Sequence, residues 1–484
     1  MMQQQLKHSK EHMFAVARIF IILHLKITLF MMNLPFGKQI ILLMLTCLLL
    51  MGKQATGTEI FRILNNENES LQCRIDLIRQ AKHEILVSYY ILKDDKIGKC
   101  LFSLLTEAAC ERGVTVRVIM DSNEGRVDKS LLAFLKNHDV EVRKFRIGKW
   151  YFLRRYSHRL HDKMLLVDNK WLIAGGRNLK EVYYELGTSF NFLDRDVLVS
   201  GNEVCAYARL HFYSIWNAAY LSRATRTGKI SPKRMQNWTL TLAASRNALS
   251  GVLPIRFDTL IDWAGSAPPL SHTVHFICDH FLEQKEGVFV ETEQKDHCST
   301  DDLIALMDSA RQSILIENPY FNPTPTWNAA FQRALARGVR MRVLTNSINS
   351  SDALIHQASY LNQRKKLLRM GMEIFEYQGP KKLHIKAFII DNKISVIGSY
   401  NIHSFSEHNN SEIAVWVSDT GTAGIHSRMM DKNLLRALRI GQNNHPIRPE
   451  GTPFPPASFD RRLRTFIFRY TIAPVLRFQT KIFN

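Results

Sequence analysis

A short polar motif occurs twice in this chain of 484 residues, and its two copies match position by position. Each copy has a histidine, a lysine two residues later, an Asp-Asn-Lys sequence after an apolar run, and finally an asparagine. The matching residues are His161, Lys163, Asp168 and Asn178 in the first copy and His384, Lys386, Asp391 and Asn401 in the second. A single His-x-Lys has little meaning, but two copies in register indicate a duplicated half-site, and therefore a chain that folds as two similar lobes.

The apolar runs inside the motif, 164–167 and 387–390, predict buried strands. Side chains alternate between the two faces of a strand, so the histidine and lysine of each copy, two residues apart, point to the same side. The aspartate follows the lysine by an odd number of residues and should face away from that side. Because Asp-Asn also favours turns, the pattern favours a turn role for Asp168 and Asp391 over direct chemistry, and both are kept among the candidate catalytic residues.

Two such half-sites facing each other would supply two imidazoles, two ammonium groups and two amides, a set that suits a phosphodiester. The lysines and asparagines can hold the non-bridging oxygens, where negative charge must be stabilised. One neutral histidine can attack phosphorus and form a covalent intermediate, while the other, protonated, donates to the leaving oxygen. We expect no metal and no cofactor, because the lysines provide the positive charge.

A nucleophilic histidine also needs an acceptor on its other ring nitrogen. Each copy is followed by an acid at the start of a predicted strand, Asp196 after the first copy and Glu412 after the second. We expect these two carboxylates to orient the histidines, with an ordinary strand-end acid as the alternative. For the histidines the alternative is a hydrogen-bonded core residue, which does not explain two matched patterns.

The two His-x-Lys-x4-Asp-x6-Gly-[Gly/Ser]-x-Asn motifs resemble those of the phospholipase D superfamily, and the resemblance covers roughly residues 60–439. Several stretches around the motifs are similar to bacterial members of the cardiolipin synthase type. They include Tyr89–Ile91, Gly175–Asn178, Asn318–Phe321 and Gly398–Asn401.

The resemblance implies a phosphatidyl-histidine intermediate, with His161 as the nucleophile and His384 as acid and then base. It also implies the residues that bind the substrate phosphate, which are Lys163, Lys386, Asn178, Asn401 and Ser399. Ser399 matches the usual serine of the family, whereas Gly176 stands in the corresponding place of the first copy.

Each half of the chain alternates strands and helices, and Gly113 and Gly338 stand where a helix C-cap glycine belongs. This alternation predicts an α/β fold of two phospholipase D-type lobes, related by a pseudo-two-fold axis, with the active site at their interface. The expected segments are lobe 1 at 57–221, a connector at 222–250, lobe 2 at 251–440, and a linker with a basic, aromatic tail at 441–484.

The first 56 residues differ in composition from the rest. The apolar run at 40–51 is shorter than the roughly 20 residues of a bilayer span and is typical of a signal peptide. A membrane anchor formed together with the apolar stretch at 14–36 is the alternative. Either way the segment predicts a membrane-associated or exported protein, at a bacterial cell envelope or secreted.

The formal net charge of +20 indicates anionic partners. Residues 461–484 alternate arginines with aromatic and aliphatic side chains and contain no acid, which is typical of a segment in a membrane interface. The alternative is a helix packed on lobe 2. Arg154, Arg155 and Arg159, just before the first histidine, are candidates for the mouth of the site.

The favoured function is therefore a phosphatidyl-transferring enzyme that passes the phosphatidyl group to water or to an alcohol. A phosphodiesterase acting on nucleic acid is the alternative, and a non-catalytic scaffold is a third. The apolar N-terminus and the basic tail favour a phospholipid substrate and a membrane surface as partners over nucleic acid, and we expect a monomer. The seven cysteines show no CxxC and no metal-ligand spacing, so the sequence predicts no zinc site.

Overall fold

The computed structural model describes residues 59–145, 158–218, 221–222, 230–265, 270, 272–280, 282–285, 288–291, 297–448 and 454–473. Residues 58–484 form one compact unit. The predicted signal or anchor segment at 1–56 lies outside the described residues. In the part of the chain that is described, no helix has the length and apolar character to span a bilayer.

Lobe 1 alternates strands and helices as the sequence predicts. Its elements are β1 (Ile60–Leu64), α3 (Glu67–Gln80), β2 (Glu84–Tyr89), α4 (Lys96–Arg112), β3 (Thr115–Asp121), α5 (Lys129–Lys136), β4 (Val140–Phe145), β5 (Arg159–Leu160), β6 (Lys163–Val167), β7 (Trp171–Gly175), the 3₁₀ turn η1 (Glu181–Tyr183), β8 (Phe192–Leu193), β9 (Asp196–Ser200), α6 (Asn202–Trp216), β10 (Leu221–Ser222) and α7 (Pro232–Ser250).

Lobe 2 follows a similar order, with an additional strand pair after its first strand. Its elements are β11 (Val274–Cys278), β12 (Leu282–Lys285), β13 (Val288–Glu291), α8 (Cys298–Asp308), β14 (Ser313–Glu317), α9 (Pro325–Ala336), β15 (Arg340–Asn346), α10 (Leu354–Arg369), β16 (Glu373–Tyr377), β17 (Lys382–Leu383), β18 (Ala387–Ile390), β19 (Ile394–Gly398), α11 (Ser404–His408), β20 (Asn410–Ser411), β21 (Ile413–Ser418), α12 (Thr420–Leu434), β22 (Ala437–Arg439) and α13 (Phe459–Tyr470).

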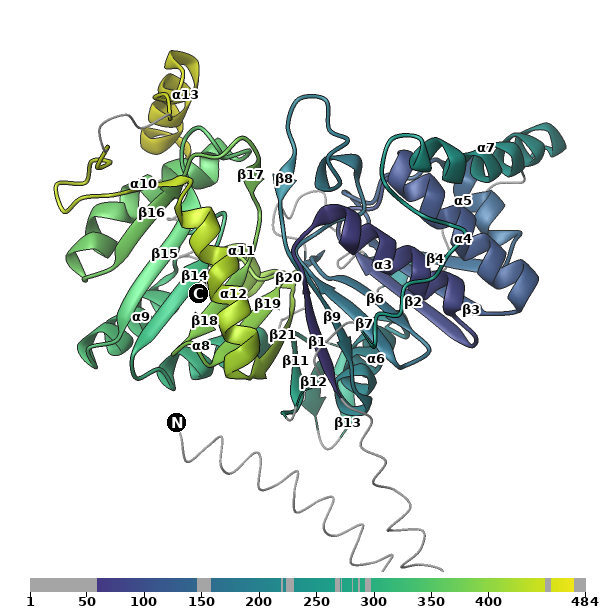
Figure 1. Cartoon of the computed structure of the whole chain (residues 1–484), viewed down its shortest axis with the longest axis horizontal. Helices are drawn as coiled ribbons and strands as arrows, with labels where there is room; N and C mark the ends of the chain where they lie inside the picture. The colour runs from purple at the N-terminus through teal and green to yellow at the C-terminus, as the bar shows by residue number, and fades with distance from the viewer. Residues whose placement is uncertain are drawn as a thin grey trace, which may run out of the picture. The chain divides into compact units, whose positions relative to one another are not determined.

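Each lobe is built on an eight-stranded mixed sheet, and the two sheets have corresponding strand orders (Figure 1). The first runs β1-β9-β7-β6-β2-β3-β4-β10 and the second β11-β21-β19-β18-β14-β15-β16-β22. In both, three neighbouring strands are parallel (β2-β3-β4 and β14-β15-β16), and the remaining pairings are antiparallel. This correspondence confirms the predicted α/β fold of two similar lobes.

Local sequence signals explain where the helices begin and end. Asp95 and Asp128 cap α4 and α5 by accepting hydrogen bonds from backbone N–H groups of the first turn. Thr324 caps α9, whose first residue is Pro325. Gly113 ends α4 with a φ of 67°, a left-handed conformation that glycine adopts without strain.

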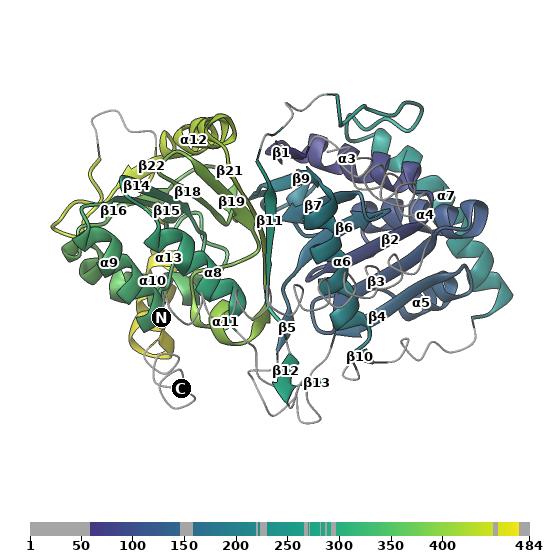
Figure 2. The same ribbon diagram turned by 90° about the horizontal axis from the view of Figure 1, so that it is seen from below.

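The two sheets meet at the strands that carry the motifs, with β9 and β7 facing β21 and β19 (Figures 1 and 2). Apolar side chains from both lobes form one buried cluster there, including Leu172, Val197, Val199, Ile397, Ile413, Val415 and Val417. Close-packed interiors resist deformation, so a site between the lobes is held in a fixed geometry.

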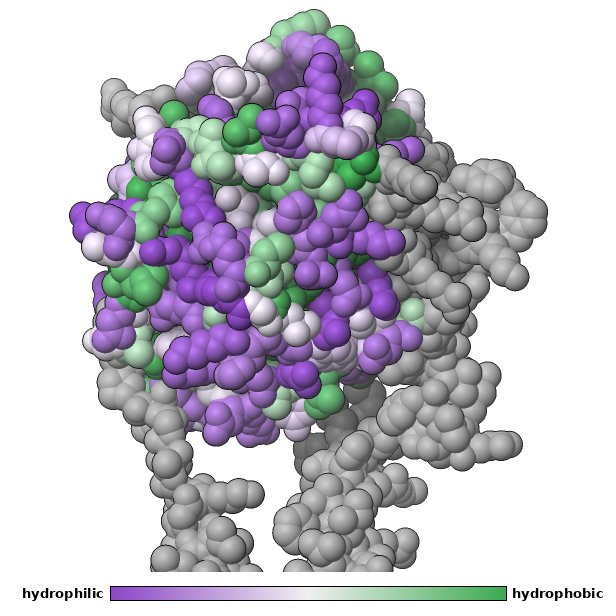
Figure 3. All heavy atoms as spheres, turned by 90° about the vertical axis from the view of Figure 1, so that its right-hand side faces the viewer, coloured by the Kyte–Doolittle hydropathy of each residue, from purple (hydrophilic) through white to green (hydrophobic). Residues whose placement is uncertain are grey.

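The segment at 222–250, predicted as a connector, is mostly the helix α7, which packs on α4 of lobe 1. Only a narrow stripe of α7 is buried, at Leu242, Ser245 and Leu249, which is why its composition resembled a linker. The chain stays on lobe 1 beyond α7, since the Trp263 indole donates to Asp76 at 3.0 Å. The outer face of this lobe is largely hydrophilic (Figure 3).

The described part of the C-terminal tail forms α13, which packs on α10 of lobe 2. The Arg461 guanidinium donates to the backbone carbonyls of Ile348 and Ser351, and Arg469 donates to Asn362 at 2.7 Å. The opposite side of the helix exposes apolar side chains, at Phe459, Leu463, Phe466, Ile467 and Tyr470. Thus α13 is a packed helix with an uncovered apolar stripe, at the same end of the unit as β8 and β17 (Figure 1).

Candidate active site

Two short strand pairs cross the boundary between the lobes and position the histidines. β5 of lobe 1 pairs in parallel with β20 of lobe 2, and β17 of lobe 2 pairs in parallel with β8 of lobe 1. One residue beyond each pair, the His161 N–H donates to the carbonyl of Ser411 at 3.0 Å and the His384 N–H donates to that of Leu193 at 2.8 Å. Each histidine therefore lies beside an acid of the other lobe.

His161 is held by Glu412 of lobe 2, with 2.8 Å between Nδ1 and Oε2. The same carboxylate accepts from the hydroxyls of Ser399 and Ser406 and from the Asn410 amide. Ser399, predicted to bind substrate phosphate, is fully buried and instead holds Glu412. The serine lies behind the acid and is not among the residues that line the cavity, so its phosphate-binding role stays a prediction.

His384 is held by Asp194 of lobe 1, with 2.6 Å between Nδ1 and Oδ2. The predicted acid, Asp196, is wrong by two residues. Sheet register gives the reason: Gly175 pairs with Asp196 while the equivalent Gly398 pairs with Ala414, so Asp194 is the counterpart of the acid in lobe 2.

Asp196 has a structural role instead. Its fully buried carboxylate accepts from the guanidinium groups of Arg74 at 3.0 Å and Arg177 at 3.2 Å and from the Ser70 hydroxyl. Removing one member of such a buried network leaves an uncompensated charge, at a cost of about 3–5 kcal/mol. The network ties α3 and β9 together behind the site.

The two motif lysines are buried beside the histidines. Lys163 donates to the backbone carbonyl of His161 at 2.5 Å, and Lys386 donates to that of His384. The Lys386 ammonium also lies 2.8 Å from Nδ1 and 3.2 Å from Nε2 of the His384 ring. Burial lowers the pKa of Lys163 to about 7 and that of Lys386 to about 8, and neighbouring carboxylates only partly offset it. A bound anion would favour the charged form of both lysines.

Both histidines are buried and favour the neutral form. Burial lowers the pKa of His161 well below its usual value, and the nearby Lys163 and Lys386 lower it further. Burial and Lys386 also lower the pKa of His384, and Asp194 opposes that shift. The two rings therefore differ in how easily they take a proton.

A cavity of about 480 Å³ opens between the lobes and is lined by both histidines and both motif asparagines. The Asn178 amide accepts from the Ile91 N–H and donates to the Tyr183 hydroxyl, which leaves its second N–H for a ligand. The buried Oδ1 of Asn401 has no hydrogen-bond partner among the described residues. The Asn178 amide, together with Arg159 and Lys180 in the lining, offers hydrogen-bond donors to an anionic group.

Aromatic and basic side chains complete the lining. Tyr90 and Tyr320 approach His161 and His384 edge-on, with ring centroids 4.8 and 6.0 Å apart. Both tyrosines lie in stretches of the sequence that resemble the phospholipase D superfamily, so the sequence offered a way to find them. The cavity-lining residue His403 lies in no such stretch. Arg159 lines the cavity and forms a bidentate pair with Asp121, while Arg154 and Arg155 lie outside the described residues.

Asp168 and Asp391, kept among the catalytic candidates, take no part in the site. Asp168 accepts from the backbone N–H groups of residues 82–84, and Asp391 from those of residues 311–313. Both have a positive φ, 53° and 52°, in the turn after the motif strand. They fasten that turn to the start of the neighbouring strand in the sheet, β2 or β14, in keeping with the turn role that the sequence pattern favoured.

Comparison with known proteins agrees with this geometry. A family model described as cardiolipin synthase, PLD-like domain, matches residues 74–216 and 303–433. Cardiolipin synthase C of Escherichia coli K12 is 28% identical over 412 residues, which cover 77% of this chain and 84% of that protein. Cardiolipin synthase A of Pseudomonas syringae pv. syringae is 27% identical over 398 residues, covering 80% and 71%.

A solved structure shares the fold. Phosphatidylserine synthase of Haemophilus influenzae Rd KW20 superposes with a TM-score of 0.61 at 13% identity, over 86% of this chain and 94% of that one. The family match spans more than half of the chain and includes both His-x-Lys motifs. The chain therefore belongs to the phospholipase D-like enzymes, in their cardiolipin synthase branch.

Proposed function

We propose that this enzyme cleaves a phospholipid phosphodiester through a covalent phosphohistidine and passes the phosphatidyl group to an alcohol or to water. The observation that carries the proposal is the crossed pairing of His161 with Glu412 and of His384 with Asp194 around one cavity. A phosphodiester bound in this cavity would meet two imidazoles that are held by different acids, and the lysines beside the histidines would add two positive charges.

In the first step His161 attacks. Its Nδ1–H donates to Glu412, so Nε2 carries the lone pair, and the lowered pKa keeps that lone pair free of a proton. The bond from Nε2 to phosphorus forms as the bond from phosphorus to the head-group oxygen breaks. Lys163, Lys386 and the motif asparagines stabilise the non-bridging oxygens.

His384 handles the proton in both steps. Its Nδ1–H donates to Asp194, so the protonated ring carries its transferable proton on Nε2. That proton goes to the leaving head-group oxygen. In the second step the same nitrogen takes the proton from the incoming alcohol or water, whose oxygen displaces His161 from phosphorus.

A membrane surface as partner is supported by α13. Its exposed apolar residues follow helical spacing and form one stripe, at Phe459, Leu463, Phe466, Ile467 and Tyr470. On the other side the helix bonds to residue 351, which is followed by the cavity-lining residues Asp352 and Ala353. An apolar stripe flanked by arginines next to the cavity suits an anionic bilayer, where each arginine contributes about 1 kcal/mol.

Vesicle sedimentation tests this surface. Phe466→Ser with Ile467→Ser should weaken binding to vesicles containing phosphatidylglycerol, because the stripe loses its central apolar area. Leu240→Ser, an equally exposed leucine on α7 of lobe 1, is the matched control and should bind as the wild type does. Equal loss in the control, or no loss in the α13 variant, would refute the role of α13.

The activity itself is tested with three substrates. Purified full-length protein is incubated with labelled phosphatidylglycerol, labelled phosphatidylcholine and single-stranded DNA. Cardiolipin formation indicates transfer to an alcohol, and phosphatidic acid indicates hydrolysis, and both should disappear in His161→Ala. Cleavage of DNA without turnover of lipid, or lipid turnover that survives His161→Ala, would contradict the proposal.

A further inference from the structure

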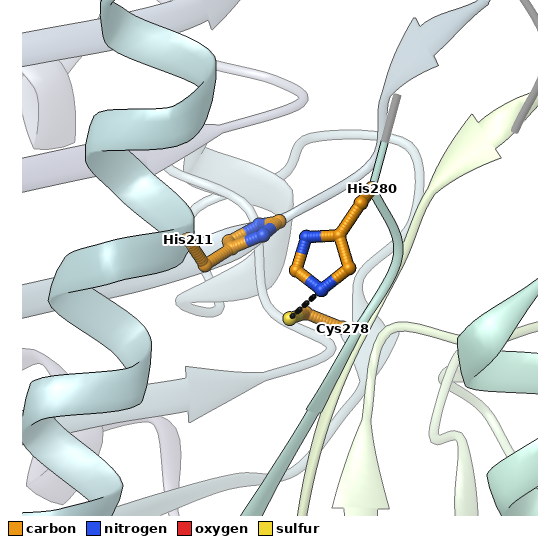
Figure 4. A group of neighbouring side chains, drawn as sticks. All are labelled: His211, Cys278 and His280. Atoms are coloured by element: carbon orange, nitrogen blue, oxygen red, sulfur yellow. Dashed lines mark hydrogen bonds between the residues drawn. The ribbon is translucent and has the colours of Figure 1, made fainter. Parts of the chain in front are cut away.

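Three potential metal ligands meet behind the active site, where lobe 1 touches lobe 2 (Figure 4). His211 comes from α6 of lobe 1, Cys278 is the last residue of β11 in lobe 2, and His280 follows two residues later. One ligand atom of each lies within 4.8 Å of the others. These three residues, the His211 group, are not among those that line the catalytic cavity.

His211 is prepared to act as a ligand. Its Nε2 lies 2.8 Å from the Asp162 carboxylate and donates to it, which leaves Nδ1 as the ring nitrogen that a metal would bind. Nδ1 is buried and makes no hydrogen bond within the described residues, and the whole residue is only 1% exposed. In zinc sites of proteins, a histidine ligand commonly donates its other ring N–H to a carboxylate, as His211 does to Asp162.

The distances and donor types in the His211 group fit a tetrahedral metal. Cys278 Sγ and His280 Nε2 are 3.6 Å apart. A tetrahedral zinc with bonds of about 2.3 Å to sulfur and about 2.0 Å to nitrogen holds such a pair about 3.5 Å apart. A set of one thiolate and two imidazoles selects zinc or another thiophilic transition metal over magnesium or calcium.

We propose that His211, Cys278 and His280 bind a zinc ion that joins α6 of lobe 1 to β11 of lobe 2. On binding, the protons on Cys278 Sγ and His211 Nδ1 go to solvent, His211 keeps its Nε2 proton on Asp162, and the fourth position takes a water molecule.

The ion would hold two parts of the active site that belong to different lobes. Asp162 precedes Lys163 in the first motif and also accepts from the Ser411 hydroxyl at 2.6 Å. Asp279, between the two lobe 2 ligands, accepts from the backbone N–H of Glu412 at 3.0 Å. Zinc at this position therefore fixes the segments that carry His161 and its acid.

Metal content provides the test. Full-length protein loaded with zinc and dialysed should retain one zinc per chain, and Cys278→Ser should retain none. Cys110→Ser, an exposed cysteine outside the group, should retain it as the wild type does. Asp162→Asn should weaken zinc binding by about 10- to 100-fold, because it replaces the charged acceptor that orients His211 with a weaker, neutral one. Equal zinc in Cys278→Ser and the wild type would overturn the proposal.

Two measurements on the wild type avoid variants that fail to fold. Cobalt in place of zinc should give the near-ultraviolet charge-transfer band of a cobalt–thiolate bond. Zinc should also raise the midpoint of thermal unfolding, because the ion binds only the folded chain, and a chelator should reverse the rise. Absence of the charge-transfer band, or an unfolding midpoint that does not respond to zinc, would overturn the site.

Discussion

The two half-sites share a motif and a strand pattern, yet they hold their histidines differently. Glu412 is anchored by two serine hydroxyls and an amide in addition to His161. Asp194 has a shorter side chain, and its carboxylate lies so close to Gly176 that a Cβ on that glycine would be 2.0 Å from Oδ1. The serine of one half and the glycine of the other are therefore each fitted to their own acid.

The lysines differ in the same way. Each lysine donates to the backbone carbonyl of its own histidine, and Lys386 in addition lies against the imidazole ring of His384. Together with the stronger lowering of the pKa of His161, this separates a ring suited to attack from a ring suited to proton transfer. A duplicated site can thus acquire two roles through residues that surround the repeated motif.

The structure and the sequence analysis differ most in which carboxylates orient the two histidines. Asp194→Asn and Glu412→Gln should each lower kcat by about 10²- to 10⁴-fold, because each amide fails to hold the correct tautomer of its histidine. Steady-state kinetics on phospholipid vesicles would measure the loss.

Asp196→Asn is the matched control for Asp194→Asn. It should destabilise the fold by about 3–5 kcal/mol through its arginine network, while kcat below the unfolding transition stays close to that of the wild type. A large loss of kcat in Asp196→Asn with full activity in Asp194→Asn would reverse our assignment.

The sequence predicted the fold because its signals are local: apolar runs, cap residues and a repeat. The sequence analysis did not identify Asp194, because strand pairing between the lobes determines which acid contacts His384. In addition, the chain from asparagine to acid is longer in lobe 1 (178–194) than in lobe 2 (401–412). The sequence did show Gly176 in place of the usual serine. That difference can be explained only when the structure places the Asp194 carboxylate against the glycine.

Exchanging the glycine and the serine sharpens the comparison. Gly176→Ser should displace Asp194 and lower kcat by about 10²-fold, the usual effect of a misplacement near 1 Å. Ser399→Gly removes one of several hydrogen bonds to Glu412 and should have the smaller effect. Equal effects of the two substitutions would show that the half-sites do not differ as described.

The pH dependence of kcat/KM should reveal the lowered pKa values of the two motif lysines. Lys163 and Lys386 have pKa values of about 7 and about 8 in the free enzyme, so kcat/KM should fall as pH rises through this range. Bound phosphate raises both pKa values, so kcat should fall only at higher pH. A fall in kcat/KM that begins near pH 10, as for ordinary lysines, would contradict the burial of their charge.

The same lysines affect the stability of the protein. Between about pH 7 and the ordinary lysine pKa of 10.5, the unfolded chain holds a Lys163 proton that the folded chain has released. The contribution of Lys163 to the free energy of unfolding therefore rises with pH across that window. Denaturant titrations at several pH values would measure this slope.

The smallest effect on activity is expected at the motif aspartates. Asp391→Asn weakens three hydrogen bonds from backbone N–H groups and should lower the free energy of unfolding by about 1 kcal/mol, with kcat unchanged. Burial would raise the pKa of Asp391, but these hydrogen bonds lower it, so its stabilisation should disappear as pH falls through the lowered pKa. Asp431→Asn on α12 is the exposed control.

Other differences from the sequence also arise from long-range packing. The three residues of the His211 group are distant along the chain, so their spacing indicates no metal, although packing of α6 on β11 brings them together. Helix α7 has few apolar residues and still folds against lobe 1, because a single buried stripe is sufficient.

The central claim is that His161 and His384 have different roles at one phosphorus atom. Rapid quenching of His384→Asn with phosphate-labelled phospholipid, followed by peptide mass spectrometry, tests it most directly. We predict a slowly decaying phosphatidyl adduct on the peptide that contains His161, and no adduct in His161→Asn. An adduct on His384, formed in wild-type or His161→Asn protein, would contradict the account.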